Sequence, residues 1–152
     1  MRLTQHADYA LRTLIYLGLK QQELSTIQEI AEAYDISRNH LMKVVGKLAA
    51  RGYIHSTRGT GGGIRLASSP DTIHVGQVVQ DMEPEDGLVE CLRPDNHCVI
   101  TPACILTGIL SQAHTAFMAE LNHYTLQDLL PQKKQRELSR LLRLKHIATV
   151  SQ

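Results

Sequence analysis

The feature that most constrains the fold of this chain is a very short break between two amphipathic helical segments. The stretch "STIQEIAEAYDISRNHLMKVVGKLAARGY" opens with Thr26 and Glu29, the spacing of a capping box at a helix start. Its apolar residues recur every three or four positions on both sides of Asp35 and Ile36, and Gly52 stands where a helix-terminating glycine belongs. Two helices should therefore meet across a tight turn.

The segment after Gly52 has a different pattern. "YIHST" and "GIRLA" are typical of short strands, and they lie on either side of "RGTGG", a glycine-rich hairpin tip. A further amphipathic helix is expected before the pair, starting between Gln5 and Asp8. A helix, a helix–tight turn–helix pair and a two-stranded hairpin, in this order, predict a winged helix-turn-helix.

In such a fold the second helix of the pair enters the major groove of DNA, and the charge of this region agrees with that role. Residues 36–65 contain six Lys and Arg residues and no acid, although the net charge of the whole chain is only +1. The predicted DNA contacts are Ser37, Arg38, Asn39 and His40 at the helix start, Lys43 and Lys47 one turn apart further along, and Arg58, Gly62 and Arg65 in the hairpin.

The chemistry of these residues suits a duplex. Arginine pairs bidentately with guanine and asparagine with adenine, so Arg38 and Asn39 are expected to read bases. Lysines suit phosphates, and Arg58 is placed to enter the adjacent minor groove. The simpler alternative is a solvated basic helix beside an ordinary hairpin. The joint occurrence of charge, short turn and hairpin in the right order favours DNA binding.

The second half of the chain is expected to be helical and to carry a loop. A short helix should open at Asp71 or Thr72, and a long one should run from Pro102 to about His123. "TLQDLLP" predicts a short helix stopped by Pro131, and the remainder is helical in part. The apolar stripe of the long helix exceeds what so small a domain needs for its own core, so we expect it to pack against its copy in a homodimer.

We therefore expect a mainly α protein in three parts. Residues 1–82 form the winged helix-turn-helix DNA-binding domain, 83–101 a cluster-binding loop, and 102–152 the dimerisation helix with a C-terminal segment. Such a dimer would present two DNA-reading helices to a palindromic double-stranded operator.

The three cysteines of the chain lie close together, Cys91 and Cys98 within residues 83–101 and Cys104 just after them. Their spacing is not that of a zinc ribbon or finger, which uses paired C-x2-C arms, nor that of a C-x-x-C redox motif. Three thiolates on one loop can hold three corners of an iron–sulfur cluster, and the fourth ligand would then come from elsewhere. His97 is one candidate, although it adjoins Cys98; zinc held with His97, or no metal, are the other possibilities.

The quoted stretches resemble the iron–sulfur winged-helix regulators of the IscR-related family, most closely its nitric-oxide-sensing repressors. The resemblance covers nearly the whole chain, through "LTQHADYALRTLIYL", "ISRNHLMKVVGKLAARGYI", "RGTGGGIRLA", "CVITPACIL" and "YTLQDLL". The cysteine loop and "SRNHLMK" are its specific parts. It implies a homodimeric DNA-binding repressor whose cluster reacts with nitric oxide. The alternatives are a sensor of iron or cluster supply and a zinc- or thiol-based redox regulator.

The resemblance also implies a ligand set. It places the cysteine ligands at Cys91, Cys98 and Cys104 and the fourth ligand at Asp8 of the partner subunit. IscR-like members have a histidine at the position of Thr107, and members with a two-iron cluster have one at the position of Arg12. These departures favour a four-iron (4Fe–4S) cluster, with a two-iron (2Fe–2S) form as the alternative.

Other functional classes find no support in the sequence. There is no Ser/His/Asp arrangement, phosphate loop or nucleotide fingerprint, so we do not expect an enzyme. Neither a signal peptide nor an apolar run near the ~20 residues of a membrane span is visible. We expect a cytoplasmic protein with no membrane partner, and in that compartment clustered cysteines bind metals or act in redox chemistry more often than they form disulfides.

Overall fold

The computed structural model describes residues 3–84 and 89–144 of the 152-residue chain. Within these ranges the α-helices are α1 (Gln5–Leu19), α2 (Ile27–Tyr34), α3 (Arg38–Ala50), α4 (Val75–Met82), α5 (Ile105–Asn122) and α6 (Gln132–Leu141). The strands are β1 (Ile54–Thr57) and β2 (Gly63–Leu66), and the 3₁₀ turns are η1 (Pro70–Thr72), η2 (Glu90–Leu92), η3 (Thr101–Ala103) and η4 (Leu126–Leu129). The predicted mainly helical fold with a winged helix-turn-helix is confirmed.

Local sequence signals set the geometry of the helix-turn-helix. Thr26 and Glu29 form the predicted capping box of α2, through hydrogen bonds of 3.1 Å and 2.6 Å between side chains and backbone. Helix α2 ends at Asp35, which adopts the left-handed conformation with φ of 52°, and α3 begins at Arg38. Ile36 is buried between the two helices, so the tight turn predicted here is confirmed.

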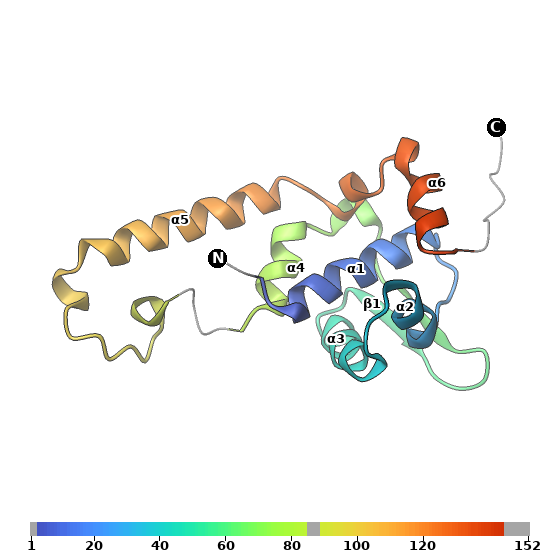
Figure 1. Cartoon of the computed structure of the whole chain (residues 1–152), viewed down its shortest axis with the longest axis horizontal. Helices are drawn as coiled ribbons and strands as arrows, with labels where there is room; N and C mark the ends of the chain where they lie inside the picture. The colour runs from blue at the N-terminus through green and yellow to red at the C-terminus, as the bar shows by residue number, and fades with distance from the viewer. Residues whose placement is uncertain (1–2, 85–88, 145–152) are drawn as a thin grey trace.

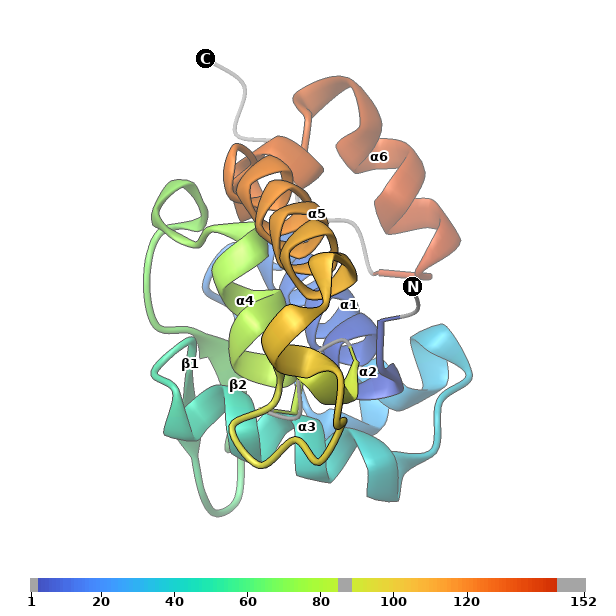
Figure 2. The same ribbon diagram turned by 90° about the vertical axis from the view of Figure 1, so that its left-hand side faces the viewer.

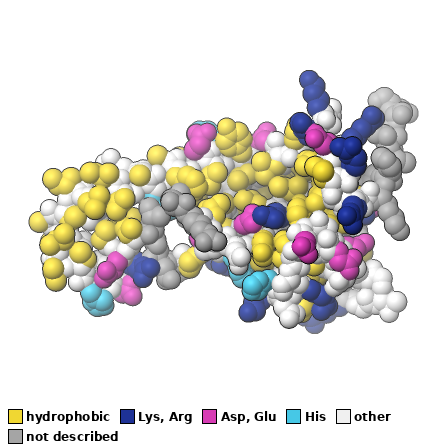
Figure 3. Space-filling view, viewed as in Figure 1, with side chains coloured by type: hydrophobic (Ala, Val, Ile, Leu, Met, Phe, Trp, Pro, Cys, Tyr) yellow, Lys and Arg dark blue, Asp and Glu magenta, His cyan; other side chains and the backbone are white. Residues whose placement is uncertain are grey.

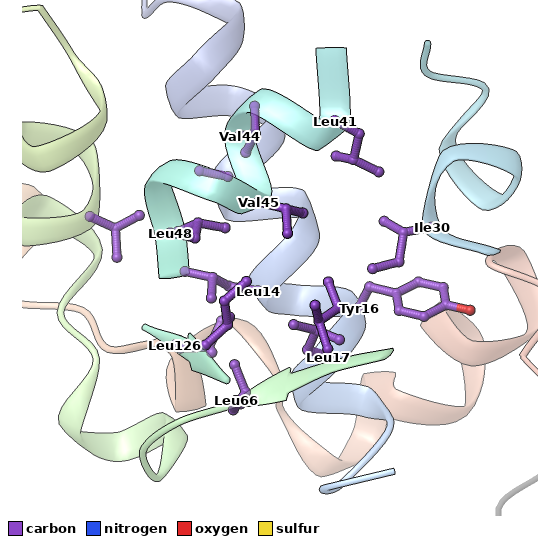
Figure 4. Packing of buried hydrophobic residues seen from close by; sticks show 14 of the residues in the cluster. Leu14, Tyr16, Leu17, Ile30, Leu41, Val44, Val45, Leu48, Leu66 and Leu126 are labelled. Atoms are coloured by element: carbon purple, nitrogen blue, oxygen red, sulfur yellow. The ribbon is translucent and has the colours of Figure 1, made fainter. Parts of the chain in front are cut away.

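Helix α1 begins at Gln5, inside the predicted range, and runs through the middle of the winged unit (Figure 1). It packs against α3, α4, β2 and η4. Figure 4 shows its Leu14 and Leu17 side chains meeting Leu48 of α3, Leu66 of β2 and Leu126 of η4. Truncating one such fully buried leucine to alanine costs about 2–5 kcal/mol, so α1 and the elements around it form one cooperative core.

The hairpin is antiparallel and is joined to the segment before α2. Ile54 pairs with Leu66 and Thr57 with Gly63; β2 turns Ile64 and Leu66 toward the core, whereas β1 buries only Ile54. The segment before α2 also pairs with β2, because the Ser25 backbone exchanges two hydrogen bonds with Ile64, of 3.0 Å and 2.8 Å. The wing is thereby anchored to the entrance of the helix-turn-helix.

The prediction that Asp71 or Thr72 opens a helix is wrong. Residues 70–72 form the 3₁₀ turn η1, and α4 begins only at Val75. Ile73 between them is extended and buried, and its carbonyl accepts a hydrogen bond from the N–H of Leu126 at 2.8 Å. Pairing with the segment after α5 therefore keeps this stretch extended, a long-range contact that local sequence signals do not reveal.

Helix α5 projects away from the winged unit and carries the cysteine loop, residues 89–104, at its far end (Figure 1). The predicted start at Pro102 is wrong by one turn. Pro102 lies in η3, and Cys104 then adopts an extended conformation before α5 begins at Ile105. The helix ends at Asn122, which lies against Gly76 of α4, so this end packs against the body of its own chain.

The described chain ends in helix α6, on the side of the molecule opposite α3 and the hairpin in both ribbon views (Figures 1 and 2). "TLQDLLP" forms η4 with a capping box between Thr125 and Asp128, and the following segment forms α6, as predicted. Residues 85–88 of the predicted cluster-binding loop and residues 145–152 of the predicted C-terminal segment lie outside the described residues. No helix within residues 3–84 and 89–144 is long and apolar enough to span a membrane.

The junction of α4 and α5 generates a stability prediction. A methyl group added to Gly76 would lie 2.9 Å from the Asn122 backbone nitrogen, so Gly76→Ala should force α5 off α4 and cost about 1–3 kcal/mol of unfolding free energy. Gly46→Ala is the matched control. Its new methyl group would meet no described atom within 4 Å, and it should stabilise α3 by up to about 1 kcal/mol. Urea unfolding of the two variants measures both effects; equal midpoints would contradict this packing of α5 on α4.

Candidate DNA interface and cysteine loop

The residues predicted to contact DNA in the first turn of α3 are all exposed. Arg38, Asn39 and His40 lie there after Ser37, which occupies the N-cap position without a capping hydrogen bond from its side chain. The opposite face of α3 is buried against the core through Leu41, Val44, Val45 and Leu48 (Figure 4). Anchored in this way, α3 presents its polar face outward as a rigid unit, with the uncapped N–H groups of its first turn open to an anion.

The two lysines of α3 lie in different surroundings. Lys43 is exposed and suits a phosphate contact. Lys47 is partly buried, and its Nζ donates a hydrogen bond to the carbonyl oxygen of Met82 at 3.1 Å. The ammonium therefore has a partner inside the protein, at the C-terminal end of α4. The two lysines are one helical turn apart, and the sequence pattern alone does not show that one is exposed and the other is bound within the protein.

The wing projects from the same side of the molecule as α3 in both ribbon views (Figures 1 and 2). Arg58 in its turn and Arg65 on β2 are exposed, as a DNA contact requires. A glycine at position 62 is also required by the fold of the turn. A methyl group there would lie 2.9 Å from the Gly59 carbonyl oxygen and still closer to the Thr57 carbonyl oxygen. The contact of Gly62 with DNA stays a prediction, as do the contacts of the other residues of α3 and the wing.

The three thiols of the cysteine loop are free and partly exposed. Cys91 lies in η2, Cys98 in the middle of the loop and Cys104 at the N-cap position of α5. Hydrogen bonds from the backbone N–H groups of Thr107 and Leu106 lower the pKa of the Cys104 thiol, which favours the thiolate that a metal requires. The donor chemistry therefore suits an iron–sulfur cluster.

The loop is held by polar contacts rather than by an apolar core. The His97 N–H donates to Glu90 Oε1 at 3.2 Å, and the Thr101 hydroxyl donates to Asn96 Oδ1 at 3.0 Å. In this conformation the ligand set is not assembled: among residues 3–84 and 89–144, no three Cys, His, Asp or Glu side chains lie close enough to hold a metal ion. The structure thus brings the three cysteines onto one loop but not into one coordination sphere.

Asp8 lies in the first turn of α1, where it is bound to Arg12 of its own chain. Two hydrogen-bonded atom pairs join them, Nε to Oδ1 at 3.0 Å and Nη2 to Oδ2 at 2.8 Å. The Arg12 guanidinium also lies over the rings of Tyr9 and Tyr34, 5.8 Å and 5.9 Å from their centroids. Burial raises the pKa of Tyr34 to about 12, so its ring stays neutral beside the cation. Arg12 therefore fixes the direction in which the Asp8 carboxylate points.

Sequence reasoning missed the residues around the end of α4. Glu83 accepts two hydrogen bonds from Thr4, and Asp81 accepts one from the Tyr53 hydroxyl. The position of Thr4 before a helical pattern could have identified it as an N-cap, which it is. Nothing local in the sequence indicates its partner, which lies 79 residues away.

Comparisons with known proteins agree with this arrangement. The model of the family Rrf2, described as "Iron-dependent Transcriptional regulator", matches residues 3–132. The chain is 46% identical to the "HTH-type transcriptional regulator NsrR" of Bacillus subtilis (strain 168), over 95% of this chain and 99% of that protein. It is 44% identical to the protein of the same name from Halalkalibacterium halodurans, over the same shares of each chain.

Two solved structures are similar in fold. One is Staphylococcus aureus CymR in its oxidized form, with a TM-score of 0.68 and 25% identity, covering 86% of this chain and 97% of that one. The other is T. potens IscR, with a TM-score of 0.71 and 19% identity, covering 90% and 91%. The likeness to the second shows the fold alone.

The geometry of α3 generates a prediction for DNA binding. Arg38→Ala and Asn39→Ala should each weaken binding to a specific site by about 1–3 kcal/mol, because each removes a base contact. Lys43→Ala should instead weaken binding to all sequences alike and reduce the slope of log affinity against log salt by about 0.9. Binding assays on a specific and a random duplex over a salt series distinguish them. Identical sequence profiles for Arg38→Ala and Lys43→Ala would refute the assignment of the groove.

Proposed function

Because this chain belongs to the Rrf2 family of transcriptional regulators, we propose that it is a DNA-binding repressor whose operator affinity depends on an iron–sulfur cluster that reacts with nitric oxide. The observation that carries the proposal is the combination of an exposed, core-anchored α3 with three free thiols on one loop. It is not an enzyme, since its curated relatives are regulators.

The DNA-binding part of the proposal rests on α3 and the wing. Both lie on one side of the molecule, and that side carries the segment without acidic residues. The exposed positively charged groups there, on Arg38, Lys43, Arg58 and Arg65, provide the electrostatic attraction for phosphates. We assign base reading to the first turn of α3 and phosphate contacts to the wing and to Lys43.

We propose that the protein is a homodimer formed through α5. None of the residues of this helix is buried in its own chain. Large apolar side chains gather at its start and in the adjoining loop (Figure 3), where Val99 is 91% and Ile105 81% exposed, and Ile100, Leu106 and Ile109 are exposed as well. A patch of this kind on a protein is a site of association. A second copy fits it best, because an isologous contact also provides two α3 helices for a palindromic operator.

We propose that Cys91, Cys98 and Cys104 hold the cluster, with Asp8 of the partner subunit as the fourth ligand. Soft thiolates bind such a cluster far better than a carboxylate does, so the three cysteines should provide most of its affinity. When bound, the cluster supplies iron atoms that nitric oxide attacks. The four-iron form suits this ligand set, since Arg12 cannot serve as a ligand where two-iron members have a histidine.

The residues of the chain then determine how ligation affects DNA binding. Asp8 must turn from Arg12, or share its carboxylate between Arg12 and iron, to reach the partner's loop. Because α1 packs against α3, ligation through Asp8 would fix the α3 helix of one subunit relative to the cysteine loop of the partner subunit. Two reading helices fixed in this way match half-sites about one helical turn apart. Loss of the ligation frees the helices to move and lowers operator affinity.

Anaerobic purification followed by visible spectroscopy and operator binding tests the proposal. The protein should be coloured, and its operator affinity should fall by at least about fivefold, the low end of typical couplings of 1–3 kcal/mol, after nitric oxide is added. Each Cys→Ala variant should lose the cluster and the tight binding, whereas Asp8→Ala should keep a cluster with an altered spectrum.

The control is His97→Ala, which should leave the spectrum unchanged if the fourth ligand is Asp8. A colourless protein with tightly bound zinc would exclude the iron–sulfur mechanism. Loss of the cluster in His97→Ala together with an unchanged Asp8→Ala variant would place the fourth ligand in the loop.

A further inference from the structure

The last turn of α4 makes two polar contacts with the DNA-binding unit that the proposed ligand set does not include. The Lys47 ammonium of α3 donates to the Met82 carbonyl, which ends α4, at 3.1 Å. The Glu83 carboxylate accepts hydrogen bonds from the backbone N–H and the hydroxyl of Thr4, at 2.8 Å and 3.1 Å. Both contacts are partly buried, so water screens them less than surface pairs.

Each contact has a helix end as one partner. A cation stabilises the carbonyl end of a helix, which is where Lys47 meets α4. An anion stabilises the amino end, which is where Glu83 meets α1, and Thr4 caps that helix by accepting from the Ala7 N–H at 3.2 Å. Adjacent residues of the chain, Met82 and Glu83, therefore bind one end of α3 and one end of α1.

A third contact braces the same turn. Asp81 accepts a hydrogen bond from the Tyr53 hydroxyl at 2.5 Å and lies 3.6 Å from the Arg51 guanidinium. Burial and this hydrogen bond raise the pKa of Tyr53, so the hydroxyl remains a donor. Tyr53 and Arg51 come just after α3, which means that the end of α4 is fixed to the C-terminal side of the recognition helix at two points.

The position of this turn in the chain gives the contacts a function. Glu83 stands six positions before residue 89, the first residue of the cysteine loop, so this turn is the root of that loop. The first turn of α1, held by Glu83, also carries Asp8. The contacts thus join three parts that the proposed function requires to act together: the loop, the helix with the fourth ligand and the helix that reads DNA.

We propose that Lys47 and Glu83 are positioning residues for operator binding, which hold α3 and the first turn of α1 in a fixed relation to the root of the cysteine loop. This assigns Lys47 a contact within the protein in place of the phosphate contact predicted from the sequence. The coupling it describes rests on the proposed function, but the contacts themselves can be tested without a cluster.

The first experiment uses cluster-free protein and a random DNA duplex over a salt series. Lys47→Met keeps the aliphatic stem and removes the charge, and Lys43→Met, one turn away and exposed, is the matched control. Lys43→Met should reduce the slope of log affinity against log salt by about 0.9, the value for one phosphate contact, while Lys47→Met leaves the slope unchanged. An equal reduction for both variants would overturn the proposal, because Lys47 would then be a phosphate ligand.

Hydrogen exchange on the same cluster-free protein tests the contacts directly. Lys47→Met and Glu83→Met, which removes the oxygen that accepts both Thr4 hydrogen bonds, should speed amide exchange in the last turn of α4 and the first turn of α1 by roughly threefold to tenfold, the effect of losing one partly buried hydrogen bond. Lys43→Met should not change it. Exchange rates identical to those of the unmodified protein in both variants would overturn the proposal.

The third experiment measures operator affinity before and after nitric oxide, in the anaerobically purified protein. The ratio of the two affinities should fall by at least threefold in Lys47→Met and return in Lys47→Arg, which restores the cation. Lys43→Met should lower both affinities and keep their ratio. An unchanged ratio in Lys47→Met would overturn the positioning role.

A ratio of one in the unmodified protein would overturn the proposed function. The salt slope and the exchange rates would still decide whether Lys47 and Glu83 hold the end of α4.

Discussion

Helix α5 does not bury its apolar side chains within its own chain, and much of the rest of the architecture depends on this. Its C-terminal end packs on the body of the molecule, against α4, while the side chains of Ile105, Leu106 and Ile109 near its start are exposed to solvent. Burying such side chains against a second copy is favourable by about 25 cal/mol per Å² of apolar surface removed from water. The same projection carries the cysteine loop away from the body of its own chain (Figure 1), which supports the proposal that the fourth ligand is Asp8 of the partner subunit.

The winged unit has the opposite character, since α1 is surrounded by elements of its own chain. It contacts the recognition helix, the hairpin, α4 and η4, and most of these contacts are fully buried aliphatic side chains. Interiors packed in this way transmit displacements rather than absorb them. A displacement of the first turn of α1 should therefore also displace α3. The polar contacts of Lys47 and Glu83 provide a second physical connection, between the root of the cysteine loop and these two helices.

Patterns of short range predicted the winged unit well. The capping box at Thr26, the break at Asp35 and Ile36 and the glycine-rich hairpin are each decided within a few residues, and each has the predicted place in the structure. A contact of long range decided one departure, since Ile73 stays extended because it pairs with Leu126. The later start of α5 is local: residues 101–103 form η3, and Cys104 after it is extended.

The candidate site divides along the same line. The exposure of Arg38, Asn39 and Lys43 follows from helical periodicity, which also indicates the buried face of α3. The different surroundings of Lys47 could not be predicted, because its partner Met82 is distant in sequence and offers only a backbone carbonyl. The pairing of Asp8 with Arg12 is local, at a spacing of four residues, yet the role proposed for Asp8 depends on a partner chain that no pattern within one sequence places.

The claim that the site is completed by a second copy can be tested directly with a mixed dimer. Two chains are co-expressed with different tags, one carrying Cys98→Ala with Asp8 intact and the other Asp8→Ala with all cysteines, and the mixed dimer is purified without oxygen. If Asp8 acts across the interface, the dimer contains one complete site, and its cluster should have the spectrum of the unmodified protein. If its spectrum is instead that of the Asp8→Ala homodimer, the fourth ligand does not come from the partner subunit, and ligation across the dimer interface is refuted.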